Sequence, residues 1–503
     1  MVKELEADVV IVGGGVAGAA IARELSQYTV QVILVEKGSD LAVGSSKANN
    51  GHIHKTLLLS LVLKSAINPN SPIYQPGSLK TRLENEGYAT WEQQWLRELD
   101  IQHKPRGLLV VARNKHELES LDEMKKVGEM LPDEYKMTEV DRDTILSIEP
   151  NVTREVIAGL YQEEYCKQVF PQELVFALGE NARQNGVTIL LRTEVIGVSR
   201  KNGYQVVETT KGPVKTAFII NAAGKYADKV ADMGGARDWR LTFRKGQLIL
   251  LDKRLRGLVT HFVNLPVEPG RHCGIVPHLA GNPYIVCGEY EPTEDRENLA
   301  TTREAFQSII KKVKGIVPAV SERDVIASFV GLRVFNSRDP GEHIIERSST
   351  NPRFINVVLR LPGLAPAPAV AKMVVGMLGD EGLQLARKPG FNPFRERIPR
   401  FRELSNVERD ALIASDARYG HVVCRCETVT EGEIIEAIRR GATTVQGVQF
   451  RTRAGMGRCQ RGFCGPRVVD ILARELGIQR TQVTFKGPGS EILKFQNKEL
   501  LKE

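Results

Sequence analysis

Residues 8–37, DVVIVGGGVAGAAIARELSQYTVQVILVEK, decide the fold of this 503-residue chain. The apolar run 8–12 is long enough for a buried strand and too short for a helix. A G-x-G-x-x-G turn follows it, and then a helical stretch over 16–26 and a second strand over 30–35. This order of strand, glycine turn, helix and strand predicts a unit that binds a dinucleotide.

Each glycine of the turn has a physical role. Gly13 permits the tight turn, Gly15 lets the backbone approach a pyrophosphate, and Gly18 lets the helix pack closely on the strand. The N-terminus of the helix offers free N–H groups and the positive end of a dipole. Glu36 closes the second strand, where a carboxylate can accept hydrogen bonds from a ribose. The fingerprint leaves FAD and NAD open, and a glycine-rich turn without a ligand is the plainer alternative.

The composition is that of an ordinary soluble globular protein, with 42% hydrophobic and 26% charged residues. This length accommodates about two to four domains. The net charge of +8 is thinly spread, so it does not indicate nucleic-acid binding. The most apolar run, 56–67, contains Lys64 and is too short to span a bilayer. We expect a core or interfacial helix there, and at most peripheral membrane contact.

Seven cysteines, four of them near the C-terminus, favour a metal site in a reducing compartment over a disulfide scaffold. The chain also opens with charged residues and no signal peptide, so we expect a cytoplasmic location, possibly at the inner face of a membrane through a partner. The remaining pattern predicts helices over 78–99, 116–128 and 172–184, a loop over the cofactor at 41–54, and strands over 107–112, 188–192, 204–209 and 218–223.

Further motifs carry a family resemblance. The fingerprint is followed in order by SSKANNG (45–51), INAAG (220–224), GLR (331–333) and PGL (362–364). This arrangement resembles the FAD-dependent oxidoreductases of the D-amino-acid oxidase and glycerol-3-phosphate dehydrogenase superfamily, over roughly residues 5–385. The resemblance implies FAD as the cofactor. It also implies an α/β and α+β fold, in which a Rossmann-like FAD-binding domain is interleaved with an antiparallel-sheet substrate domain.

In that family the INAAG segment approaches FAD from a later strand. PGL opens a helix whose dipole can stabilise the anionic reduced flavin. The residues that the resemblance assigns to FAD are Gly13, Gly15, Val16, Ala17, Gly18, Glu36, Lys37, Ser45, Ser46, Asn50, Val195, Ala223, Gly224, Gly363 and Leu364.

The second informative region contains two tight pairs of cysteines, Cys424 with Cys426 and Cys459 with Cys464. Four thiolates flanked by arginines and glycines can bind one soft metal centre, and structural zinc is an alternative because it also takes four thiolates. We expect a helix followed by a strand between the pairs. The C-x-C and C-x4-C module resembles the bacterioferritin-associated-ferredoxin-like domain, which implies a [2Fe–2S] cluster.

These features predict the domain organisation. The FAD-dependent oxidoreductase region covers 1–395, with a linker at 396–417, a [2Fe–2S] domain at 418–480 and a C-terminal tail at 481–503. Within the first region, the FAD-binding parts are about 1–90, 155–235 and 330–385, and the substrate domain is about 91–154 and 236–329.

Among flavoproteins that join these two parts, the chain most resembles the anaerobic type of glycerol-3-phosphate dehydrogenase. The resemblance implies hydride transfer from C2 of sn-glycerol 3-phosphate to flavin, giving dihydroxyacetone phosphate. This chemistry needs a base for the hydroxyl proton, for which His52 and His54 are candidates, and a cation for the phosphate. Arg333 is the candidate for the phosphate, and Arg244 and Lys245 are weaker candidates. Each of these side chains has a plainer alternative, as a loop histidine or a surface ion pair.

The chain departs from the family pattern in three places. Residues 55–74 intervene before the QPGSLK segment, residues 356–361 are bulkier than usual, and Leu361 and Ala365 flank PGL without a hydroxyl group. A second functional class therefore stays open, namely a component of a proline-type or 2-hydroxy-acid dehydrogenase complex, or a non-catalytic electron-transfer component. In either class we expect electrons to pass through the cluster to partner electron-transfer, NAD(P)H-linked or quinone-linked subunits.

Overall fold

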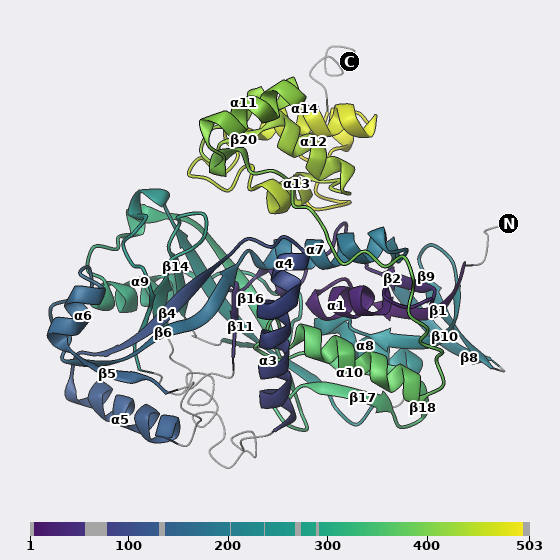
Figure 1. Cartoon of the computed structure of the whole chain (residues 1–503), viewed down its shortest axis with the longest axis horizontal. Coiled ribbons are helices and arrows are strands. Elements are labelled where there is room, and N and C mark those ends of the chain that lie inside the picture. The colour runs from purple at the N-terminus through teal and green to yellow at the C-terminus, as the bar shows by residue number, and fades with distance from the viewer. Residues whose placement is uncertain are drawn as a thin grey trace.

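The computed structural model describes residues 5–55, 78–129, 136–201, 203–235, 237–266, 273–287 and 291–495. Two large sheets lie side by side, and a small helical domain from the C-terminal part of the chain lies over them (Figure 1). The predicted apolar helix at 56–67 lies outside the described residues. In the described part of the chain, no helix is long and apolar enough to cross a membrane.

The first sheet is built around β1, which lies between β10 and β2 and runs parallel to both. Its strand order is β17-β18-β10-β1-β2-β7, with β9 and β8 continuing from β10. Parallel central strands are covered on both faces, which explains why the fingerprint strand is a continuous apolar run. The strands are β1 Leu5–Val12, β2 Val32–Val35, β7 Thr188–Leu190, β8 Val195–Lys201, β9 Tyr204–Thr209, β10 Val214–Asn221, β17 Ile344–Ser348 and β18 Asn351–Val358.

Several helices share the main apolar core with this sheet, among them α1, which packs against both α7 and α10, and α3, which packs against α10. The predicted helix after the fingerprint is confirmed as α1 Val16–Leu25, and the one over 172–184 as α7 Pro171–Gln184. The predicted helix over 78–99 is α3 Leu79–Thr90, which continues through a π-helical turn, Trp91–Trp95, into α4 Leu96–Glu98. The remaining helices here are α8 Ala227–Gly234 and α10 Ala367–Asp380.

The second sheet is largely antiparallel, as the family resemblance implied. Its order is β15-β11-β14-β13-β12-β4-β6-β3, with β16 beside β11 and β5 beside β6. Helix α9 packs against β13 and β14, and α5 against β4. The elements are β3 His52–His54, β4 His103–Ala112, β5 Thr138–Asp141, β6 Ala158–Val169, β11 Leu241–Leu251, β12 Phe262–Asn264, β13 Cys273–Val276, β14 Tyr284–Cys287, β15 Glu291–Thr293, β16 Val325–Asn336, α5 Lys115–Glu129, α6 Arg142–Ile148 and α9 Arg303–Ile316.

Three strands of the second sheet fall within ranges that the sequence assigned to the FAD-binding parts. They are β3, β6 and most of β16. The stretch expected as a loop over the cofactor, 41–54, contains a short 3-10 helix, Ser45–Lys47, and ends as β3. The chain therefore passes directly from the first sheet into the second sheet, and residues 41–54 form the boundary between the two sheets.

The C-terminal domain has its own core, formed by α12 Glu431–Arg439, α13 Val445–Thr452 and α14 Gly465–Leu476 with the short pair β19 Val422–Cys424 and β20 Val429–Thr430. The expected strand between the cysteine pairs is wrong, because α13 occupies that place. Thr444 caps α13 by accepting a hydrogen bond from the backbone N–H of Gly447, which favours a helix start. The predicted linker 396–417 includes α11 Asn406–Ser415, which packs on the first turn of this domain.

Candidate functional site

The glycine turn packs the backbone of β1, α1 and β10 at very short range. Gly13 has a φ of +108°, and a Cβ there would lie 2.5 Å from the carbonyl oxygen of Ala222. A Cβ on Gly18 would lie 2.0 Å from the carbonyl oxygen of Gly13. A Cβ on Gly15 would meet only the hydroxyl of Ser46, at 3.2 Å. Gly13 and Gly18 are therefore required by the fold, whereas Gly15 leaves room for a ligand.

The start of α1 suits an anionic ligand. Gly15 is its N-cap and provides no side-chain cap, and only the N–H of Val16 is bound by a side chain, the Ser46 hydroxyl at 3.0 Å. The N–H groups of Ala17 and Gly18 are in the same first turn, where uncapped donors and the helix dipole favour a phosphate. The predicted pyrophosphate-binding segment thus has the geometry that this ligand requires.

Glu36 lies at the end of β2 beside this turn and is 9% exposed. Its carboxylate accepts hydrogen bonds from the backbone N–H of Gly14 at 2.7 Å and of Gly38 at 2.6 Å. Burial raises the pKa of Glu36, although these two donors oppose the shift. The remaining lone pairs of the carboxylate can accept hydrogen bonds from ribose hydroxyls, as predicted.

The loop that carries Ser45, Ser46 and Asn50 joins the two sheets. The Ser45 hydroxyl donates to the carbonyl oxygen of Leu332 at 2.8 Å, next to Arg333. Gly331 has no room for a Cβ, because the carbonyl oxygen of Ala48 would lie 2.2 Å away. The absence of a side chain at Gly331 therefore allows this loop to lie directly against β16.

The other predicted FAD residues surround the same region. Ala223 and Gly224 follow β10, and Gly224 has a φ of +56°. The ammonium of Lys37 lies 3.3 Å from the ring centroid of Tyr226. Val195 is the buried first residue of β8. The PGL segment differs from expectation, because α10 begins at Ala367, whereas Gly363 and Leu364 precede it after a cis Leu361–Pro362 bond.

Of the two candidate bases, His52 has the clearer signature of a ligand contact. Its Nε2 is buried without a partner among the described residues, and its Nδ1 lies 3.1 Å from the amide nitrogen of Asn50. Burial lowers the pKa of His52 to about 3, and nearby His54 and Arg106 add to the effect, so the ring is neutral at physiological pH. His54 instead binds the carbonyl oxygen of Lys55 through Nδ1 at 2.9 Å and stacks on Tyr165.

The three candidate cations occupy different positions. Arg333 on β16 lies opposite Arg244 on β11, so both side chains share one face of the sheet. The Arg333 guanidinium lies over Gly246, where a Cβ would be 2.9 Å from its Nε. Lys245 has the opposite orientation along β11, is buried and pairs with Glu291 at 3.0 Å. Lys245 therefore has a structural ion pair, whereas Arg333 and Arg244 extend over the same face of the sheet.

Sequence reasoning missed Lys47, which lies between Ser46 and Asn50. Burial lowers the pKa of Lys47 to about 8, and the charges of Lys486 and Lys225 contribute. No described carboxylate forms an ion pair with it, and its ammonium lies 5.1 Å from the ring centroid of Phe450 on α13. A part-buried cation without a described carboxylate partner, on the loop beside the glycine turn, suits a phosphate. The signal in the sequence was its place inside SSKANNG.

The four candidate metal ligands form two pairs of thiols. Cys426 and Cys459 are exposed, with their sulfur atoms 3.8 Å apart, and Cys424 and Cys464 are buried and hydrogen-bonded to each other. The hydrogen bond from Cys464 lowers the pKa of Cys424 to about 6. In the described part of the chain, no three histidine, cysteine, aspartate or glutamate side chains converge as a mononuclear site requires. Four neighbouring thiolates suit a [2Fe–2S] cluster with two thiolates on each iron, and zinc also takes four thiolates.

The backbone around the thiols also fits a cluster. The N–H of Gly455 donates to the sulfur of Cys424 at 3.4 Å. A Cβ on Gly457 would lie 2.3 Å from the Cβ of Cys426. The non-glycine residues Thr428, Gln460 and Arg461 have left-handed backbone conformations and lie next to the candidate ligands in the sequence. Such conformations cost about 1 kcal/mol or more each and persist where the surroundings require them. Cys464 is the N-cap residue of α14 without a side-chain cap hydrogen bond, and its hydrogen bond to Cys424 raises the pKa of its thiol.

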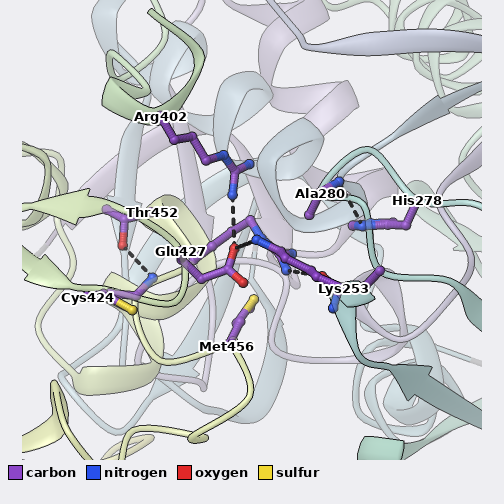
Figure 2. A network of polar contacts seen from close by, with 12 residues as sticks. Lys253, His278, Ala280, Arg402, Cys424, Glu427, Thr452 and Met456 are labelled. Carbon is purple, nitrogen blue, oxygen red and sulfur yellow. Dashed lines mark hydrogen bonds and ion pairs between the residues drawn. The ribbon is translucent and has the colours of Figure 1, made fainter. Parts of the chain in front are cut away.

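A buried carboxylate joins this domain to the rest of the chain. Oε2 of Glu427, the residue after Cys426, binds Lys253 at 2.8 Å, Arg402 at 2.9 Å and Arg453 at 3.0 Å. These cations belong to the second sheet's η6 turn, Lys253–Leu255, to the linker and to the end of α13, and Figure 2 shows Lys253 and Arg402 converging on Glu427 from different sides. Burial opposes ionisation of Glu427, but Arg453 and Lys253 outweigh it and lower its pKa.

A second group of buried ion pairs fixes the domain to the fingerprint sheet. Both guanidinium nitrogens of Arg451 bind Asp40, which follows β2, and the Nη2–Oδ1 distance is 2.9 Å. The same guanidinium stacks 3.9 Å from the ring centroid of Phe176 on α7. Glu180 of α7 binds Arg395 at 2.8 Å and Arg440 at 3.3 Å. Charged side chains thus connect the domain to both sheets.

Comparison with known proteins identifies both parts. Residues 8–377 match the family described as FAD dependent oxidoreductase, and residues 422–474 match the BFD-like [2Fe-2S] binding domain. The chain is 36% identical to a glycerol 3-phosphate dehydrogenase of Caloramator mitchellensis, over 97% of this chain and 98% of the relative. It is 23% identical to one subunit of the anaerobic glycerol-3-phosphate dehydrogenase of Escherichia coli K12, over 93% and 88% of the two chains.

The fold matches a solved structure with the cofactor present. This is the dithionite-reduced L-alpha-glycerophosphate oxidase of Mycoplasma pneumoniae with FAD bound, with a TM-score of 0.67 and 30% identity. The match covers 78% of this chain and 98% of that one. Together with the two family matches, it shows FAD and a [2Fe–2S] cluster as the cofactors.

Gly15→Val tests the FAD site. Only the Ser46 hydroxyl limits a Cβ there, so the variant should fold, but its side chain occupies the space of the pyrophosphate and should release the flavin. The flavin absorbance of purified protein and its circular dichroism measure the two effects. Gly18→Val is the matched control, because its clash with the backbone of Gly13 should prevent folding. A folded Gly15→Val protein with full flavin absorbance would refute the assignment.

Glu427→Gln tests the attachment of the C-terminal domain. Removing the charge leaves Lys253 and Arg453 close together without this buried partner and leaves Arg402 with only the described contact to Glu403 at 3.4 Å, which should lower the free energy of unfolding by about 3 kcal/mol. Denaturant titration measures the loss. The control is Glu436→Gln, which removes a part-exposed pair with Arg440 on the same domain and should cost roughly 1 kcal/mol or less. Equal losses in the two variants would contradict the role of Glu427.

Proposed function

Because this chain belongs to the family of FAD dependent oxidoreductases, we propose that it oxidises sn-glycerol 3-phosphate to dihydroxyacetone phosphate and passes the electrons to a partner protein. One observation carries this proposal. The chain matches a relative named glycerol 3-phosphate dehydrogenase over 97% of its own length, so the similarity covers both the flavin region and the cluster domain. The residue roles and the domain bounds below are parts of the same proposal.

When bound, FAD can accept a hydride, and the [2Fe–2S] cluster can carry single electrons. The substrate loses a hydride from C2 and a proton from the C2 hydroxyl. We assign the proton to Nε2 of His52, the buried ring nitrogen that has no partner among the described residues. A neutral imidazole can accept it, and the dianionic phosphate of a bound substrate raises the low pKa of His52 toward a useful range. The Asn50 amide lies beside the other ring nitrogen, and the orientation in which its oxygen accepts a hydrogen bond from Nδ1–H is the one that leaves the lone pair of Nε2 free for the proton.

The phosphate of the substrate is assigned to Arg333. Its guanidinium lies on the side of β16 that faces β11, and its strand is joined through Leu332 and Gly331 to the loop that leads to His52. A guanidinium binds a phosphate dianion through two parallel hydrogen bonds. This geometry contributes affinity and also orients the bound substrate, including its C2 atom. The proposed phosphate ligand on β16 and the proposed base on β3 thus lie on two strands that the loop at 41–54 holds together.

The cluster domain is assigned to residues 418–480, and its exposed ligands Cys426 and Cys459 define the side from which electrons leave. The relative from Escherichia coli is named as one subunit of an anaerobic dehydrogenase, which supports a complex with further electron-transfer proteins. Thiolate ligands of this kind persist in a reducing compartment, which supports a cytoplasmic location at most peripherally attached to a membrane through a partner.

Anaerobic reduction of the flavin tests the substrate. Glycerol 3-phosphate should bleach the flavin absorbance, whereas proline and 2-hydroxy acids should do so at least a hundredfold more slowly. Arg333→Ala should weaken the apparent affinity for glycerol 3-phosphate by tenfold or more, since such a charge-assisted pair contributes about 2–3 kcal/mol. The FAD content should not change.

Arg338→Ala is the control, because Arg338 follows β16 and pairs with Glu346 near the surface. Its apparent affinity should equal that of the parent. Faster reduction by proline or a 2-hydroxy acid would favour the alternative class of dehydrogenase, and an Arg333→Ala protein with unchanged affinity would remove the assignment of the phosphate site.

Cys459→Ser tests the metal centre. Loss of one of the four thiolates should remove iron and acid-labile sulfide together and abolish electron transfer to the natural partner. Reduction of the flavin by substrate should persist, because it needs only His52, Arg333 and FAD. Metal analysis of anaerobically prepared parent protein completes the test, and zinc in place of iron and sulfide would overturn the proposal.

A further inference from the structure

A cavity of about 360 Å³ opens on the second sheet beside the C-terminal domain. It is lined by the start of β4, by the turn before β12 and by the loop after β13, which includes His278. Asn282 of that loop binds Arg453 at 3.3 Å, and Figure 2 shows His278 on the same side of the Glu427 network as Lys253. This volume is within the range of small-molecule sites in proteins, roughly 300–1,000 Å³.

The wall of the cavity is basic. Lys104, Arg106 and Arg256 line it, and none of the residues that line it is acidic. Arg106 contacts neutral groups, namely the side-chain oxygen of Gln168 at 3.2 Å and the carbonyl oxygen of Thr260 at 3.4 Å. Arg256 reaches the carbonyl oxygen of Ala280 at 3.5 Å. No described carboxylate forms an ion pair with any of the three.

The nearest acid does not neutralise these cations. Glu149 is buried, and its Oε1 accepts hydrogen bonds from the N–H and hydroxyl of Thr260 and from the N–H of His261. Burial lowers the pKa of Arg106 and the charge of Glu149 only partly opposes this shift, while the same carboxylate oxygen also contacts Nδ1 of His261 at 2.8 Å. Three cations on one concave wall create a positive potential that attracts an anion.

Two features show that the cavity is built to hold these groups in place. Gly281 has a φ of +88°, and a Cβ there would lie 2.4 Å from Nε of Arg256, so the glycine makes room for the guanidinium. Gln102 has its side-chain oxygen buried without a partner among the described residues. A buried acceptor of this kind needs a donor, which a hydroxyl group of a ligand provides.

We propose that this cavity binds a small phosphomonoester that carries a hydroxyl group. Lys104, Arg106 and Arg256 bind the phosphate, and Gln102 accepts the hydrogen bond from the hydroxyl. The cavity is separate from the site assigned to His52, because Gln168 closes the space between them. Gln168 is fully buried, binds Arg106 and the carbonyl oxygen of Pro277, and lies opposite His52 in the β3–β6 pair.

Calorimetric titration of the FAD-loaded full chain tests this site with two probes, inorganic phosphate and glycerol 2-phosphate. The second probe has its C2 oxygen esterified, so it cannot undergo the oxidation proposed above. Lys104→Gln with Arg256→Gln should weaken the binding of both probes at least tenfold. Arg303→Gln with Lys311→Gln, which removes two exposed cations from α9, should leave the binding unchanged.

Gln102→Leu separates phosphate from its ester. It should weaken glycerol 2-phosphate severalfold and leave inorganic phosphate unaffected, because only the ester carries an alcohol hydroxyl beyond its phosphate group. Unchanged binding of both probes in the Lys104/Arg256 variant would overturn the site, and unchanged binding of the ester in Gln102→Leu would overturn the hydroxyl-bearing ligand. Either result is independent of which substrate reduces the flavin.

Discussion

The structure depends on one buried carboxylate that faces three cations. Side-chain exposure of Glu427 is 0%, and its Oε2 contacts Lys253, Arg402 and Arg453 from three separate stretches of the chain. Buried charges are costly unless they are paired, and Lys253, which lies outside the C-terminal domain, loses this partner if the domain moves away. Since Glu427 follows Cys426 directly, the contact that docks the domain also positions a candidate ligand of its [2Fe–2S] cluster.

The loop after β2 extends this constraint to the flavin region. Lys47 of that loop lies against Phe450 of α13, and Asp40, a few residues earlier, binds Arg451. On its other side the loop is tied to β16 through Ser45. The segment assigned to the flavin therefore contacts both the substrate-side sheet and the cluster domain. The C-terminal domain is thus fixed beside this segment by side-chain contacts.

Much of this could be predicted from the sequence because the signals are local. The strand, glycine turn and helix at 8–26 follow from spacing and apolar pattern, and the four C-terminal cysteines follow from their pairing. The assignment of β6 to the second sheet could not be predicted, because strand partners are set by contacts between distant segments. Helix α13 was missed for a related reason. Its residues are β-branched in part, and its tertiary contacts with α7 and α12 override that preference.

The charged residues of the site divide in the same way, into those that local motifs predict and those whose contacts depend on distant parts of the chain. Arg333 and His52 were found from motifs, whereas nothing in the sequence marked Glu427 beyond its place next to a ligand. Its three partners are separated from it by 25 residues or more, so spacing along the chain gives no sign of them. Lys245 was a candidate by position, but its pairing with Glu291 depends on the register of β11 with β15.

The central claim is that one folded chain carries electrons from a hydride-accepting flavin to a docked one-electron cluster. Anaerobic titration of the full chain with glycerol 3-phosphate, followed by flavin absorbance and by electron paramagnetic resonance of the cluster, tests it most directly. The account predicts that the flavin bleaches and that the signal of a reduced [2Fe–2S] cluster develops in the same protein, with two electrons in the flavin and one in the cluster. Complete bleaching of the flavin while the cluster stays oxidised would contradict it.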